Sequence, residues 1–282
     1  MIFFEYLFYF VAASASPLQR RWLAKTKNIE NKGQINLSFW VVFIGAILSL
    51  SFPFFSDFFI SGNKFYLIFL AFICGIAGAG TSVFSYIAQK HVEAGISTLV
   101  SNIYTPITII LATIFLHEKL TFLQIIGTIL LLFAILLISK KHRIGKFSFD
   151  KYFLLMLSSG VMLAFLLVAE RALVKTTGFS AGTMISWWST CLFLGVATFL
   201  TKNKNQYSKK DITITGVLKF LQNLSWVILV FTVGNLSLVS SVTTFKVIIM
   251  FILAAVFLKE KQDLPRKILG SVIAVAGLLL MK

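Results

Sequence analysis

Lys246 is the residue in this sequence with the clearest potential for chemistry. It lies near the middle of residues 236–257, a run with no other charged residue. A lysine at the centre of a membrane helix costs about 2.5–3.5 kcal/mol on insertion scales, so it should face a bundle interior or an aqueous cavity. We interpret it as part of a substrate site. The alternative is a structural lysine bonded to carbonyls or a carboxylate, and only Glu5 and Glu170 lie within apolar runs.

A second polar group lies in the run 213–233. Its members stand at positions i, i+3, i+4 and i+7, the spacing of one helix face: Lys219, Gln222, Asn223 and Trp226. A polar stripe inside a bilayer must face protein or water. Two interpretations stay open: the stripe lines a cavity, or Lys219 reaches the headgroups while the amides bond to neighbouring helices.

The composition places these residues in a membrane protein. The chain has 282 residues, of which 58% are hydrophobic and 13% charged, against roughly 25% charged in soluble domains. Mean hydropathy is +0.90. The formal charge of +16 would suit a nucleic-acid partner, but the basic residues mostly stand in short segments between apolar runs, as in cytoplasmic loops. We therefore expect a lipid bilayer and no nucleic acid as partner.

Ten apolar runs are each about long enough for a membrane helix, and the connections between them are too short for a soluble domain. The sequence predicts an all-α integral membrane protein with ten transmembrane helices, multi-pass in the inner (plasma) membrane. The runs are 2–23, 36–56, 65–88, 95–116, 122–139, 152–174, 179–200, 213–233, 236–258 and 265–281.

The first run has features of a signal peptide, since it is short and ends in Ala-Ser-Ala-Ser. It has no basic segment before it, however, and it contains Glu5. We interpret it as a retained helix, because the internal repeat includes it.

Two sequence patterns occur twice. Leu-His-Glu-Lys at 116–119 recurs as Leu-Lys-Glu-Lys at 258–261, and Arg21 with its neighbours matches Arg171 after 150 residues. Glu260, like its counterpart in the first motif, is predicted to form a local ion pair or a helix cap. The chain is therefore predicted to consist of two halves of five helices each. Because five is odd, the second half starts on the opposite side of the membrane and is inverted relative to the first, as in secondary transporters. The predicted halves are residues 1–141 and 150–282.

The 142-residue shift between the motifs aligns polar residues of the fourth and ninth runs. Inverted-repeat transporters bind substrate near the midplane between the repeats, so one site should contain both sets. A positive site with hydroxyls and amides favours a carboxylate, phosphate or similar anion. The predicted substrate-binding residues are Lys246, Lys219, Gln222, Asn223, Trp226, Thr243, Thr244, Asn102 and Tyr104.

The first half resembles a known family. Pro106 in the fourth run, Phe-Leu-His-Glu-Lys-Leu-Thr at 115–121 and Gln-Ile-Ile-Gly at 124–127 resemble the EamA domain of the drug/metabolite transporter superfamily, and residues 233–281 resemble it more weakly. The resemblance implies a ten-helix transporter of unspecified cargo. Thr-Thr-Phe-Lys at 243–246 is also similar to the Thr-Thr-Arg-Lys motif of the nucleotide-sugar branch, with Phe245 replacing the arginine.

The orientation in the membrane has two competing predictions. Alternate loops carry nineteen basic residues on one side against five on the other, which puts both termini outside by the positive-inside rule. The family resemblance implies both termini inside.

Three functions follow from these features. The first is a secondary carrier that moves a small polar metabolite, carboxylated or otherwise anionic, by alternating access. The second is a proton-coupled exporter of cationic drugs or amines that uses Glu5 or Glu170, and the third is a non-transporting membrane scaffold subunit. The sequence contains no His-Glu-x-x-His and no Walker motif, so we expect no enzyme, ATP-driven pump, metal or cofactor. Protons are a candidate coupling ion.

Overall fold

The computed structural model describes residues 2–27, 30–116, 121–139, 150–201, 206–233, 245–260 and 263–280, and no strand occurs in these ranges. The predicted all-α fold is confirmed for this part of the chain. The elements are α1 (Ile2–Thr26), α2 (Asn31–Ser49), η1 (Phe52–Phe54), α3 (Lys64–His91), α4 (Ala94–Ser101), α5 (Tyr104–Leu116), α6 (Phe122–Ser139), α7 (Lys151–Leu200), α8 (Lys209–Val233), α10 (Lys246–Phe257) and α11 (Leu264–Leu280).

Each predicted apolar run contains helix in the part that the structure describes. Among the described residues, three stretches are long and apolar enough to cross a membrane: Asn31–Phe54, Lys64–His91 and Lys151–Leu200. Shorter apolar helices occupy Phe122–Ile135 and Lys246–Phe257. Large apolar side chains such as Phe65, Phe199 and Phe257 are exposed on the outside, as expected for a surface in contact with lipid.

Helix α7 consists of two limbs that meet at Gly178. Its backbone is not helical there, with φ 74° and ψ 170°, a region that side chains disfavour. A Cβ at this position would also lie 2.6 Å from the ring of Phe59, in the segment between η1 and α3. The turn therefore requires glycine, and the predicted division between the sixth and seventh helical runs falls here.

We expect Gly178→Ala to lower the free energy of unfolding by about 1–3 kcal/mol, because alanine is strained at this φ and collides with Phe59. The thermal unfolding midpoint of the purified protein measures this. Gly195→Ala in the same helix is the matched control, since its Cβ would meet Phe39 only at 3.3 Å. Equal midpoints for the two variants would contradict the strain argument.

The fourth run is interrupted between α4 and α5. Pro106 has no N–H to donate to the carbonyl of Asn102, four residues earlier. That carbonyl instead accepts a hydrogen bond from the N–H of Thr105 at 3.0 Å. The predicted kink from Pro106 is confirmed, and it leaves Tyr104 as the first residue of a new helix.

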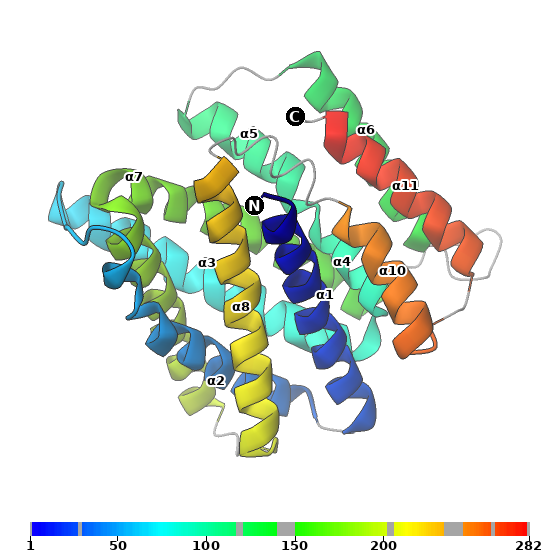
Figure 1. The fold of residues 1–282 in the computed structure, drawn as a ribbon, viewed down its shortest axis with the longest axis horizontal. Helices are drawn as coiled ribbons and strands as arrows, with labels where there is room; N and C mark the ends of the chain where they lie inside the picture. The colour runs from blue at the N-terminus through cyan, green and yellow to red at the C-terminus, as the bar shows by residue number, and fades with distance from the viewer. Residues whose placement is uncertain are drawn as a thin grey trace.

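The helices pack in pairs (Figure 1). α3 lies along α7, α1 against α8, and α6 beside α11, while α10 packs on α4 and α1. A core of buried side chains joins α4, α6, α10, α11 and the first limb of α7, with Leu99, Leu131, Met156, Val247 and Ala274 at its centre. This core fixes the start of α10, where Lys246 lies.

A buried ion pair ties together helix ends that are distant in sequence. The Nε of Arg21 in α1 donates to Oε1 of Glu260 at 2.9 Å, and its Nη1 donates to the carbonyls of Gln89 and Lys90 at 2.8 and 2.6 Å. The other Glu260 oxygen accepts the N–H of Ala94, at the start of α4, at 2.9 Å. The network therefore holds α1, the α3–α4 junction and the end of α10 together.

This arrangement changes the prediction for Glu260. The carboxylate does cap a helix, but that helix is α4, and its ion-pair partners are Arg21 and Lys25 of α1. Lys261, like the motif at 117–119, lies outside the described residues.

Candidate functional site

Lys246 is the first residue of α10 and is partly buried. Its ammonium donates a hydrogen bond to the hydroxyl of Tyr9 in α1 and interacts electrostatically with Tyr104 of α5. Tyr9 is only 3% exposed. Among the described residues, no carboxylate forms a salt bridge with Lys246. A tyrosine of α1 thus bonds the lysine without neutralising it, and Tyr104 of α5 lies near it.

The starts of α5 and α10 are related by the predicted repeat. Tyr104 begins α5, and Lys246, 142 residues later, begins α10. The first turn of a helix carries a partial positive charge from its unpaired N–H groups. Both helix starts therefore add positive potential beside the ammonium, which favours an anion at this position.

Lys219 is partly buried on α8, near the same place. Its Nζ donates to Oε1 of Gln222 at 3.5 Å, and its charged neighbours are Lys246 and Arg20. The structure thus brings Lys219 close to Lys246, as the cavity interpretation requires. Asn223 is also partly buried.

Trp226 packs mainly against α1. Its ring centroid lies 5.9 Å from that of Tyr9, and both belong to an apolar cluster with Leu229. The indole therefore positions Tyr9, the residue that binds the Lys246 ammonium.

Asn102 caps the C-terminus of α4 and is 3% exposed. Its side-chain Nδ2 is buried without a hydrogen-bond partner, so a donor is available at the break between α4 and α5. Thr243 and Thr244, the other predicted hydrogen-bonding residues, lie outside the described part of the chain.

Arg20 was not among the predicted binding residues, because it was counted with the basic residues of the loops although the first predicted run, 2–23, contains it. Helix α1 continues to Thr26, so Arg20 lies inside it. Its guanidinium lies 4.8 Å from the ring centroid of Tyr86 in α3, and its Nε is buried without a hydrogen-bond partner. The spacing of Tyr9, Ser16 and Arg20, which follows one helix face, is the signal that identifies it.

The two candidate proton-binding carboxylates lie in different surroundings. Glu5 stands one turn before Tyr9 on α1, and its Oε2 is buried without a hydrogen-bond partner. Glu170 is hydrogen-bonded to Ser186, between the two limbs of α7. Glu5 thus lies on the same helix as Tyr9, the residue bonded to Lys246.

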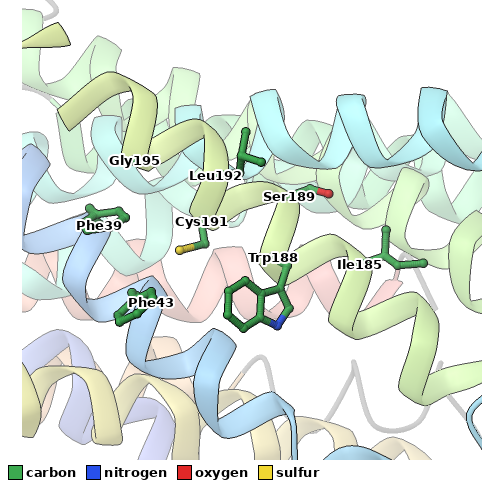
Figure 2. A pocket seen from close by; sticks show the side chains of 8 residues that line it. All are labelled: Phe39, Phe43, Ile185, Trp188, Ser189, Cys191, Leu192 and Gly195. Carbon is green, nitrogen blue, oxygen red and sulfur yellow. The ribbon is translucent and has the colours of Figure 1, made fainter. Parts of the chain in front are cut away.

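A separate apolar groove lies between α2 and the second limb of α7, with a volume of about 530 Å³. Figure 2 shows its lining, which comes from these two helices: Phe39, Phe43, Ile185, Trp188, Ser189, Cys191, Leu192 and Gly195. It contains none of the predicted binding residues. Its apolar walls suit hydrocarbon better than a polar metabolite.

Comparison with known proteins identifies the family. The model of the EamA-like transporter family matches residues 3–140. A solved crystal structure of a protein 16% identical in sequence superposes with a TM-score of 0.58, over 96% of this chain and 94% of that chain, and thus shares its fold. No curated protein matches. The chain is therefore an EamA-domain member of the drug/metabolite transporter superfamily, a multi-pass transmembrane transporter.

Proposed function

We propose that this protein is a secondary carrier of a small anionic metabolite in the inner (plasma) membrane. The observation that carries the proposal is the Lys246 ammonium, bonded to Tyr9 and near Tyr104, with no carboxylate paired to it in the described part of the chain. A desolvated cation without a counter-charge is unfavourable. A bound carboxylate or phosphate supplies that counter-charge through charge-assisted hydrogen bonds.

Transport would use alternating access by two inverted halves, residues 1–141 and 150–282, with ten membrane crossings. Reciprocal packing supports this arrangement. By the predicted repeat, α1 corresponds to the first limb of α7, α3 to α8, and α5 to α10. The contact of α1 with α8 therefore matches that of α7 with α3, and the contact of α1 with α10 matches that of α7 with α5. The contact of α6 with α11 pairs equivalent helices of the two halves. Exchanging the halves therefore preserves these contacts, as expected for a pseudo-twofold axis in the membrane plane.

A second candidate function rests on Glu5. Its buried, unpartnered oxygen lies on α1 beside the lysine site and suits a carboxylate that exchanges a proton. In an anion carrier it would couple transport to protons. If it binds the substrate itself, the protein is an exporter of cationic amines.

Ligand-dependent thermal stability of the purified protein tests the proposed function. A ligand that binds only the folded state at 100 times its Kd stabilises it by about 2.7 kcal/mol, which raises the midpoint on the order of 5 °C. We expect organic acids and phosphorylated compounds to do so, and amines to have no effect. Stabilisation by amines alone would replace the anion carrier with the cation exporter, and a midpoint unchanged by both would favour the scaffold.

A further inference from the structure

Helices α1 and α8 enclose a polar strip between two fixed contacts. At one end the rings of Tyr9 and Trp226 lie 5.9 Å apart, and at the other the hydroxyl of Thr215 donates to Oε1 of Gln19 at 2.9 Å. The residue order of these pairs shows that the helices run antiparallel side by side, as Figure 1 shows. The segments between the two contacts must therefore face each other.

Polar side chains occupy both segments. From the α1 segment comes Ser16, on the helix face of Tyr9, and its buried hydroxyl has no hydrogen-bond partner among the described residues; Arg20, on the same face, follows directly after Gln19 and ends the strip. From α8 come Lys219 and Gln222, joined by their 3.5 Å hydrogen bond. The strip thus has hydrogen-bonding groups from both helices.

The two cations of the strip lack counter-charges within the described residues. Neither Arg20 nor Lys219 forms a salt bridge there, whereas the neighbouring Arg21 pairs with Glu260. Arg20 instead places its guanidinium over the ring of Tyr86, with its Nε buried and unbonded. A planar guanidinium held in this way leaves donors for a bidentate oxyanion.

The strip leads away from Lys246. Arg20 follows Tyr9 by eleven residues, about 16 Å along the helix axis. In the antiparallel register set by the Tyr9–Trp226 and Gln19–Thr215 contacts, Lys219 lies about opposite Ser16, between the levels of Tyr9 and Arg20 on α1. Lys246, Lys219 and Arg20 therefore follow one another in a row. A ligand bound at Lys246 can extend along this row to the side chains of Lys219 and Arg20.

We propose that Arg20 and Lys219 form a second anion subsite, and that the substrate is an elongated dianion with one acidic group at Lys246 and the other at this subsite. The proposal rests on the proposed function, since it assigns a substrate class to the same transport site. A monoanion would occupy only the Lys246 end and leave two cations unpaired.

The test compares adipate with its monoamide, which has the same length and one charge fewer. Binding to the purified protein is measured by isothermal titration. We expect adipate to bind the parent roughly 10- to 100-fold more tightly than the monoamide. This ratio corresponds to the binding free energy that one charge-assisted hydrogen-bonding group contributes. Arg20→Gln or Lys219→Gln should remove most of this preference, because each weakens adipate binding more than monoamide binding.

Three variants make the result specific. Arg171→Gln removes an exposed arginine of α7 and should keep the full preference for adipate. Arg20→Lys retains the charge without the planar donors and should restore part of the preference. Lys246→Met should weaken both ligands together. Unfolding midpoints without ligand verify that each variant is folded.

The outcomes separate the two proposals. If Arg20→Gln and Lys219→Gln both keep the parent's preference for adipate while Lys246→Met loses both ligands, the second subsite is wrong and the anion carrier stands. If the parent binds both molecules equally, the dianion assignment is wrong. If the parent binds neither molecule, the subsite and the anion site fail together.

Discussion

Glu260→Ala is expected to lower the free energy of unfolding by about 3–5 kcal/mol, the cost of removing one partner from a buried ion pair. The Arg21 guanidinium, whose residue is 7% exposed, would lose its carboxylate, and the N–H of Ala94 would lose its cap. Such a loss corresponds to a fall in the thermal midpoint on the order of 10 °C. Thermal unfolding in detergent measures it.

The exposed ion pair between Lys27 and Asp211 is the matched control. Its side chains are 38% and 17% exposed, so solvent screens the attraction. Lys27→Met should therefore change the free energy of unfolding by about 1 kcal/mol or less. Glu260→Ala leaves the buried Arg21 charge without its partner, whereas the double variant Arg21→Met with Glu260→Leu removes both buried charges. The double variant should therefore be more stable than Glu260→Ala. Similar small effects for Glu260→Ala and Lys27→Met would contradict a stabilising role for the buried network.

Lys246→Met has the largest expected effect on binding. Losing a charge-assisted hydrogen bond costs about 1.5–3 kcal/mol, so anion affinity should fall roughly 10- to 150-fold. The folded protein without ligand should keep or gain stability, because a partly buried cation without a carboxylate partner has been replaced by an apolar chain of similar length. Ligand titration and thermal unfolding of the same sample measure the two effects.

The direction of the stability change separates a binding lysine from a structural one. Lys210→Met removes an exposed charge from the same helix as Lys219 and should alter neither affinity nor stability. Lys246→Arg keeps the charge and should retain part of the affinity. Destabilisation by Lys246→Met without a change in anion affinity would make this lysine a structural residue.

Local sequence patterns were sufficient to predict the helices and their breaks. Apolar runs predicted the helical segments, because a bilayer accepts only hydrogen-bonded backbone and so each run must form helix. Pro106 predicted the break between α4 and α5 through its missing N–H. The sequence also predicted one site with Lys246, Lys219 and Tyr104, and in the structure Lys246 has both other residues as electrostatic neighbours; that they bind substrate stays a prediction.

Contacts between distant residues were beyond local patterns. Arg21 and Glu260 are 239 residues apart, and no periodicity relates them. Arg20 lies within the first predicted run, but its contact with Tyr86 of α3 joins residues 66 positions apart and depends on tertiary packing. The contact of Trp226 with Tyr9 likewise depends on tertiary packing.

Uptake by the reconstituted protein tests the central claim, that Lys246 is the counter-charge of a transported anion, most directly. Proteoliposomes preloaded with unlabelled adipate would be given labelled adipate outside, and exchange would be followed with time for the parent and for Lys246→Met. We predict rapid exchange by the parent, none above empty liposomes by Lys246→Met, and no exchange of a labelled amine by either. Equal adipate exchange by the parent and Lys246→Met, or exchange of the amine alone, would contradict the account.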